Sequence, residues 1–305
     1  MSLRSRPFTK LPEGTTKSSK MTINIAGFHV YIYGVDELSP QQAEDTVVLF
    51  HVHGRTRSYA DAELFAHQFL FQLKQMKNLA KGFVVATFDS RNHGERAAWP
   101  PTRLTTILRV TSNRHATDRL TSYDWNGGNP KHAQDMLAMI DGNVFDIQAV
   151  MKYLKVYTGD RFTPTEFVMS GLSLGGHTAW DILSKVEGIQ AAIIIVGSPN
   201  LTDLLTERLG DAADSEDGTG LTKWPKSISA MYKARDQSLE QINGKRILIL
   251  NGALDMLVPN KFTLPWVERN ASQNDVSFNV FENTGHWLSF EMMDTIVEWV
   301  SQKIA

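Results

Sequence analysis

The chain has 305 residues with no cysteine, 31 basic and 33 acidic residues, and a net charge of −2. The lack of cysteine excludes disulfides, thiolate nucleophiles and cysteine-ligated zinc sites, and the charge gives no indication of the basic face that nucleic-acid binding needs. No apolar run reaches the length of a membrane-spanning helix, so we expect neither a nucleic-acid partner nor a membrane span.

Residues 1–21 are polar and contain five basic side chains and one acidic side chain. They lack the continuous apolar stretch of a secretory signal peptide. Pro7, Pro12 and Gly14 oppose the amphipathic helix of a transit peptide. We therefore expect a flexible tail over residues 1–21. The missing cysteines and signal peptide favour a cytoplasmic location.

Past this tail, strand-like and helix-like runs alternate, which is the pattern of a mostly parallel sheet covered by helices. Residues 23–33 alternate in polarity and are predicted to form one antiparallel edge strand. Residues 46–52 and 83–88 are continuously apolar, as expected of strands buried on both faces, and a helical pattern over 58–77 lies between them. The later predicted elements are strands at 166–169, 191–196, 246–250 and 276–281, and helices at 143–157, 177–186 and 287–304.

Two long segments interrupt this alternation. Residues 91–141 are rich in Arg, Thr, Asn and Pro, and residues 198–243 combine two short helical patterns with an acidic loop. Both follow the carboxyl ends of predicted strands, which is the edge of an open α/β sheet where ligands bind. Irregular segments of this length are uncommon unless they are functional. We expect a pocket-side insertion at 91–141 and a lid at 198–243, with residues 22–197 and 244–305 as the core.

The most informative motif is Gly171-Leu172-Ser173-Leu174-Gly175, a G-x-S-x-G run between a predicted strand and a predicted helix. A strand that turns sharply into a helix around a serine exposes the hydroxyl on a strained backbone. Glycines two residues before and after the serine permit that turn, because a Cβ at either position would meet the crossing chain. The context therefore indicates a nucleophilic serine at position 173.

A serine hydroxyl needs a histidine base that is oriented by an acid. Asp255 follows the predicted strand at 246–250, and His286 lies between the next strand and the last helix. The predicted catalytic residues are therefore Ser173, Asp255 and His286, in that order along the chain.

With these residues in place, the chain resembles the α/β-hydrolase superfamily from about Thr22 to its C-terminus. The resemblance is carried by the Ser173 motif, by Asn-Gly-Ala-Leu-Asp ending at Asp255 and followed by Val-Pro, and by Gly-His ending at His286. It implies a serine hydrolase fold of eight strands, with the first pair antiparallel and a small helical lid.

The same resemblance implies an oxyanion hole. The family uses a His-Gly pair after its third strand, which is His53-Gly54 here, so the backbone N–H groups of Arg55 and Leu174 are the expected donors. The run Arg91-Asn92-His93-Gly94 resembles the end of the family's fourth strand, where its role is mainly structural.

Other interpretations of these residues stay open. His51-Val52-His53 places two imidazoles together as in a metal site, but residues 54–57 supply neither the Asp nor the His that such sites use. The glycines of residues 171–176 do not have the spacing of a dinucleotide fingerprint. Asp203 is a rival for the triad acid, and Glu282 is a less favoured one because it lies so close to the histidine along the chain.

We therefore expect a serine hydrolase without cofactor or metal that cleaves a small or medium carboxylic ester, lactone or thioester, as a monomer or homodimer. An amidase, peptidase or acyltransferase would use the same triad. A ligand-binding member of the fold without catalysis is a further alternative.

Overall fold

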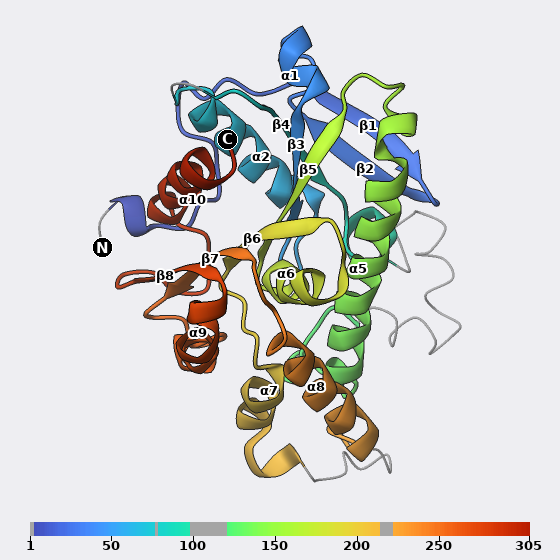
Figure 1. Cartoon of the computed structure of the whole chain (residues 1–305). Helices are drawn as coiled ribbons and strands as arrows, with labels where there is room; N and C mark the ends of the chain where they lie inside the picture. Colours follow the sequence, from blue (N-terminus) through green and yellow to red (C-terminus); the bar gives the residue numbers. More distant parts are fainter. Residues whose placement is uncertain (1–2, 77–78, 98–120, 214–221) are drawn as a thin grey trace.

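A computed structural model of the protein describes residues 3–76, 79–97, 121–213 and 222–305. Its centre is an eight-stranded sheet with helices on both faces (Figure 1), in the order β1-β2-β4-β3-β5-β6-β7-β8. The strands are β1 (Lys20–Ile25), β2 (Phe28–Tyr33), β3 (Thr46–Val52), β4 (Gly82–Thr87), β5 (Pro164–Leu172), β6 (Ile189–Ile195), β7 (Arg246–Gly252) and β8 (Asp275–Phe281).

The sheet is mostly parallel, as predicted. β2 pairs antiparallel with β1 and β4, and the strands from β4 to β8 pair in parallel. The prediction of one strand over residues 23–33 is wrong, because Ala26 and Gly27 both take positive φ angles, 50° and 88°, and turn the chain into a hairpin. A two-residue hairpin turn with positive φ at both positions matches the twist of the flanking strands.

The helices that flank the sheet follow the chain order of the predicted alternation. One helix, α5, begins at His132 rather than at residue 143, so residues 132–141 are helical and not part of an irregular insertion. Ala133, Met136 and Ile140 on this first part are buried in a cluster with residues of α7 (Leu201–Leu209) and α8 (Lys226–Leu239), and that packing sustains the additional turns. The α-helices are α1 (Pro40–Glu44), α2 (Tyr59–Leu73), α5 (His132–Tyr157), α6 (Leu174–Lys185), α7 (Leu201–Leu209), α8 (Lys226–Leu239), α9 (Leu264–Asn270) and α10 (Phe290–Lys303).

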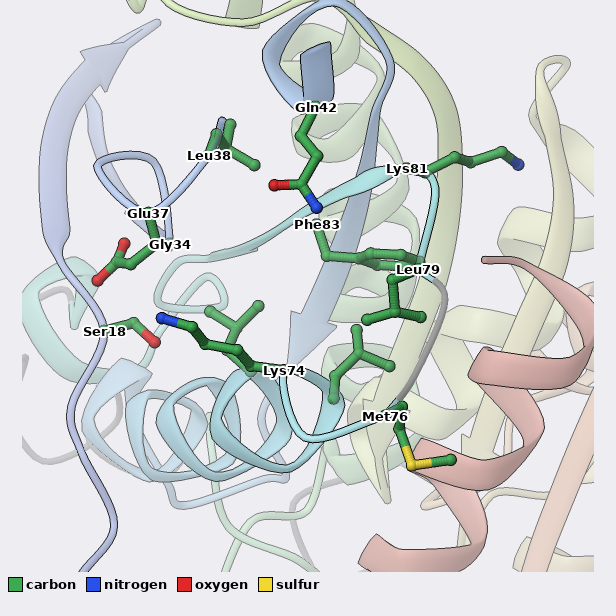
Figure 2. A pocket seen from close by; sticks show the side chains of 12 residues that line it. Ser18, Gly34, Glu37, Leu38, Gln42, Lys74, Met76, Leu79, Lys81 and Phe83 are labelled. Atoms are coloured by element: carbon green, nitrogen blue, oxygen red, sulfur yellow. The ribbon is translucent and has the colours of Figure 1, made fainter. Parts of the chain in front are cut away.

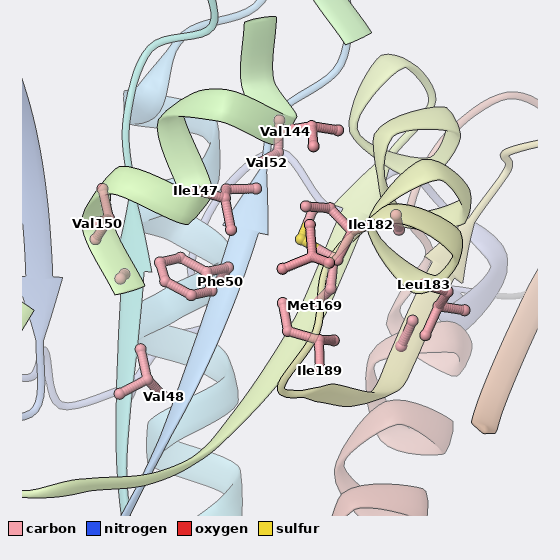
Figure 3. Packing of buried hydrophobic residues seen from close by; sticks show 14 of the residues in the cluster. Val48, Phe50, Val52, Val144, Ile147, Val150, Met169, Ile182, Leu183 and Ile189 are labelled. Carbon is pink, nitrogen blue, oxygen red and sulfur yellow. The ribbon is translucent and has the colours of Figure 1, made fainter. Parts of the chain in front are cut away.

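Alternate side chains of β3 build the core on both faces of the sheet. Val48, Phe50 and Val52 pack in one cluster with residues of α5 and α6 (Figure 3). Val47 and Leu49 pack in the other cluster, with residues of α2 and α10. Every residue of β3 is buried. The strand is apolar except for its first residue, Thr46, and His51, as expected of a strand covered on both sides.

Among the residues that the structure describes, no helix combines the length and apolarity needed to cross a membrane. A cavity of about 380 Å³ lies where α2 meets the amino-terminal end of β4 (Figure 2). Phe83, Leu73 and Leu79 supply apolar lining, and Lys74 and Glu37 supply charge. Ser173 lies at the opposite, carboxyl-terminal edge of the parallel strands, so this cavity is separate from the site described below.

Candidate active site

Ser173 lies between the last residue of β5 and the first residue of α6, with φ 55° and ψ −107°. A positive φ is uncommon for a residue with a side chain and marks local strain. A Cβ on Gly171 would lie 2.2 Å from backbone atoms of Gly175, and a Cβ on Gly175 would lie 2.0 Å from the carbonyl oxygen of Val52. Close backbone packing on both sides of the turn therefore requires glycine at both flanking positions.

Three side chains that are far apart in the sequence meet at this turn. His286 lies in the loop between β8 and α10, and its Nε2 atom is 2.7 Å from Ser173 Oγ. The Nδ1 atom of His286 is 2.8 Å from Asp255 Oδ2, in the loop after β7. The structure thus brings Ser173, His286 and Asp255 into one chain of hydrogen bonds.

The Asp255 carboxylate is held in a single orientation. It is buried, and its Oδ1 atom accepts hydrogen bonds of 2.8 Å from the backbone N–H groups of both Leu257 and Val258. Its other oxygen is left to accept from His286 Nδ1–H, which leaves Nε2 without a proton and facing the serine hydroxyl. This tautomer is assigned from the hydrogen-bond partners, and it is the one that a general base requires.

The two rival acids lie elsewhere. Asp203 is exposed in the first turn of α7, where its carboxylate accepts a 2.7 Å hydrogen bond from Asn200 Nδ2. Glu282 is exposed just after β8. The position beside His286 Nδ1 belongs to Asp255.

Ser173 and His286 line a cavity of about 330 Å³, a volume near the lower end of small-molecule sites. Arg55, Phe65 and Trp287 also line it. The lining therefore combines aromatic rings with polar groups.

The loop after β3, predicted to supply an oxyanion donor, is fixed by His53. The Nδ1–H group of His53 donates to the carbonyl oxygen of Gly54 at 2.8 Å, and Nε2 accepts from the backbone N–H of Ser90 at 3.0 Å. Burial lowers the pKa of His53 to about 4, so the ring is neutral at pH 7. The uncharged imidazole joins the loops that follow β3 and β4.

Arg55, which follows this pair, directs its side chain away from bulk solvent. Its guanidinium donates to the carbonyl oxygen of Ser122 at 3.1 Å and to Asp124 Oδ2 at 3.2 Å. This part of the predicted pocket-side insertion therefore contacts a residue of the cavity wall. Residues 98–120 of the same insertion lie outside the described residues. Leu174, the other predicted donor, is the first residue of α6, where a backbone N–H has no acceptor within the helix.

His51 in β3 and His53 directly after the strand make separate contacts. His51 stacks on Phe65 with ring centroids 3.7 Å apart, and its Nδ1 atom lies 2.9 Å from Ser170 Oγ. Burial lowers the pKa of His51 to about 3, while both nitrogens of His53 are taken up as described above. Within the described ranges, no three His, Asp or Glu side chains are grouped as metal ligands would be.

Residues 198–243, predicted to be a lid, contain α7 and α8, and residues 214–221 of this segment lie outside the described part of the chain. The buried Arg235 of α8 donates to Asp181 Oδ1 of α6 and to Asp236 Oδ1, each at 2.7 Å. Asp236 in turn accepts from the backbone N–H groups of Leu201 and Thr202 at the start of α7. One guanidinium therefore ties α7 and α8 to the helix that begins at the serine.

The sequence did not indicate that the N-terminal segment takes part in this site. Pro7, Phe8 and Thr9 line the same cavity as Ser173, although they fall within the segment predicted to be a flexible tail. Further along, the backbone N–H of Ser18 donates to His67 Nδ1 of α2 at 3.2 Å. The only local signal was Phe8, an aromatic residue among polar neighbours.

The sequence matches no known family model and no curated protein. The structure is similar to TT1662 from Thermus thermophilus (TM-score 0.61, 16% identity, 94% of this chain and 98% of that chain). It is also similar to the esterase Pf2001 of Pyrococcus furiosus (TM-score 0.56, 17% identity, 98% of this chain and 100% of that chain). The chain has the α/β-hydrolase fold.

The α/β-hydrolase fold also accounts for a third similarity. The acylaminoacyl peptidase of Pyrococcus horikoshii matches with a TM-score of 0.53 and 13% identity over 96% of this chain, but only 43% of that chain is covered. The match thus concerns a part of a larger protein. At identities this low, the similarity shows only that the folds are alike, and one fold can support many different reactions.

Proposed function

We propose that this chain is a serine hydrolase that cleaves a small or medium carboxylic ester through an acyl-enzyme. One observation carries the proposal: His286 bridges Ser173 Oγ and Asp255 Oδ2 with contacts of 2.7 and 2.8 Å, at a cavity of ligand size. A nucleophile, a base within hydrogen-bond reach and a buried acid behind the base are the parts that nucleophilic acyl transfer needs.

In the proposed first half-reaction, Ser173 Oγ attacks the ester carbonyl carbon while His286 Nε2 takes the hydroxyl proton. The carbonyl oxygen becomes an oxyanion, which the backbone N–H groups of Arg55 and Leu174 would stabilise. Collapse of this tetrahedral intermediate breaks the bond to the leaving alcohol, which receives the proton from His286. The serine then carries the acyl group as an ester.

In the second half-reaction, His286 removes a proton from water, and the hydroxyl attacks the acyl carbon. The intermediate collapses, the carboxylic acid leaves and Ser173 regains its proton. Asp255 keeps the imidazole in its working tautomer and stabilises the imidazolium in both halves. The removal of one oxyanion donor typically costs about 3 kcal/mol of transition-state stabilisation. No cofactor or metal takes part in this scheme.

Labelling with a fluorophosphonate probe tests the nucleophile. We expect the intact protein to be labelled at Ser173 and to hydrolyse p-nitrophenyl esters, and we expect Ser173→Ala to lose both properties while keeping its thermal unfolding midpoint. Ser170→Ala is the matched control, because Ser170 is a buried serine of β5, the strand that ends just before Ser173, and its hydroxyl contacts His51. Labelling that persists in Ser173→Ala contradicts the proposal.

An amidase or peptidase is the second candidate, and the similarity to acylaminoacyl peptidase favours it. The same triad would attack an amide, but an amine is a poorer leaving group than an alcohol and depends more strongly on the proton from His286, so the two activities separate in kinetics. Turnover of matched p-nitrophenyl esters and p-nitroanilides of the same acyl group distinguishes them, and we expect the ester to be the better substrate. The cytoplasmic location and the monomeric or homodimeric state stay predictions.

A further inference from the structure

The N-terminal segment, residues 4–9, is held against the stretch of chain that follows His286. The indole N–H of Trp287 donates to the carbonyl oxygen of Ser5 at 3.1 Å, and the backbone N–H of Phe8 donates to the carbonyl oxygen of Leu288 at 2.8 Å. Pro7 forms an isolated antiparallel bridge with Ser289. This backbone pairing positions the segment directly beside His286, the proposed base.

Side chains hold the segment as well. The ring of Phe8 meets the ring of Phe290 edge to face, with centroids 5.2 Å apart, and Arg4 forms an ion pair with Asp294. Phe8 is half-buried and packs on the cluster that lies between the sheet, α2 and α10. Both partners come from the first turns of α10, so a rigid helix carries the segment.

The segment forms part of the cavity that contains Ser173. Pro7, Phe8 and Thr9 line it together with Phe65 and Trp287. Phe8 is thus an aromatic side chain that is anchored on one side and borders the ligand space on the other. An aromatic ring that is packed against its protein neighbours moves little, so it limits the length of apolar ligand that the pocket accepts.

We propose that Phe8 is a specificity-determining residue that sets the length of the apolar acyl or alcohol group accepted at Ser173. The inference rests on the proposed ester hydrolysis and deepens it. The substrate class is an ester with a short to medium apolar chain, which contacts the wall formed by Pro7, Phe8 and Thr9. A smaller side chain at position 8 lengthens the accepted chain, and a larger one shortens it.

The test compares kcat/KM for p-nitrophenyl acetate, butyrate, octanoate and laurate in the full chain. In Phe8→Ala we expect the ratio of octanoate to acetate to rise by at least about tenfold, since a single methylene group in an apolar pocket typically changes discrimination by that order. In Phe8→Trp we expect the ratio to fall. Phe8→Leu keeps an apolar contact with Phe290 and should give an intermediate rise, so a folding defect in one variant leaves the trend measurable.

Arg4→Ala is the matched control. Arg4 belongs to the same segment but does not line the cavity. Its ion pair with Asp294 is exposed and contributes little, so the hydrogen bonds at Ser5 and Phe8 keep the segment in place without it. We expect its chain-length profile to equal that of the wild type. A second measurement, amide hydrogen exchange at Phe8 in the unmodified protein, should show protection, because this N–H is bonded to Leu288.

Three outcomes would overturn the inference: a chain-length ratio that is the same in all Phe8 variants, an equal fall in kcat for every ester in both Phe8→Ala and Arg4→Ala, or exchange at Phe8 as fast as in a free peptide. A wild-type protein that neither hydrolyses any of the esters nor reacts with the fluorophosphonate contradicts the proposed function instead. The two failures are therefore distinguishable.

Discussion

The backbone N–H of Thr56 donates a 3.0 Å hydrogen bond to Nε2 of His93. The other ring nitrogen, Nδ1–H, donates to the carbonyl oxygen of Arg91 at 2.9 Å, and burial lowers the pKa of His93. The imidazole is therefore neutral, with Nε2 as the acceptor of the hydrogen bond from Thr56. Thr56 has φ 64°, which a β-branched residue rarely adopts, and it directly follows Arg55, a proposed oxyanion donor. His93 thus holds the proposed oxyanion loop in a strained conformation.

This relationship makes His93 a positioning residue. We expect His93→Ala to lower kcat for p-nitrophenyl butyrate by about 10- to 100-fold with a smaller change in KM. The reason is that a displaced Arg55 N–H group would stabilise the transition state less, while substrate binding would change little. His93→Gln offers a side-chain acceptor and should recover part of kcat. A His93→Ala enzyme with unchanged kcat would contradict this role.

Asp255→Asn tests the proposed acid. An amide at this position can hold the imidazole in the wrong tautomer, so we expect kcat to fall by about 10⁴-fold while the protein stays folded. Asp203→Asn is the control: it replaces an exposed carboxylate bonded to Asn200 and should leave kcat within twofold. If Asp203→Asn were the more damaging change, the acid would have to be reassigned.

Arg235→Met tests the connection between α6, α7 and α8. The substitution leaves the carboxylate of Asp181 buried with fewer partners, and breaking such a buried pair typically lowers the free energy of unfolding by about 3–5 kcal/mol. Urea denaturation measures the change. Arg269→Met removes an exposed pair with Glu240 and should cost less than about 1 kcal/mol. Equal losses of unfolding free energy in the two variants would show that the buried pair stabilises the fold no more than the exposed pair does.

Acid should destabilise the fold through its buried histidines. Burial lowers the pKa of His53 to about 4 and the pKa values of His51 and His132 to about 3, whereas an unfolded histidine titrates near 6.5. Between these values the unfolded chain binds protons that the folded chain does not, so the free energy of unfolding falls as the pH drops below about 6.5. His53 alone accounts for about 3 kcal/mol once the pH has passed its folded pKa.

Urea denaturation at pH 7, 6, 5 and 4.5 measures this slope. His53→Gln should flatten it by about one proton, or 1.4 kcal/mol per pH unit, relative to the wild type. A wild-type stability that is constant from pH 7 to pH 5 would contradict the prediction.

Much of the fold followed from patterns that the chain carries locally. The apolar run of β3 was predicted over the same seven residues, Thr46–Val52, that form the strand in the structure, because a strand buried on both faces is mostly apolar. The hairpin at Ala26 and Gly27 was missed, since alternation continues through a two-residue turn without a break. The start of α5 was also missed, because its first turns pack on α7 and α8 rather than on the sheet, and that contact has no local signature.

For the candidate site, the sequence by itself determined the residue types and their order: a serine between glycines, an aspartate after one late strand and a histidine after the next. Only the tertiary structure decided that His286 lies within hydrogen-bond reach of both partners, that His53 and His93 hold the loop of Arg55, and that Phe8 borders the cavity. The physical reason is distance along the chain. A sharp turn depends on neighbouring residues, whereas a contact between Phe8 and Phe290 exists only when the packed core brings opposite ends of the chain together.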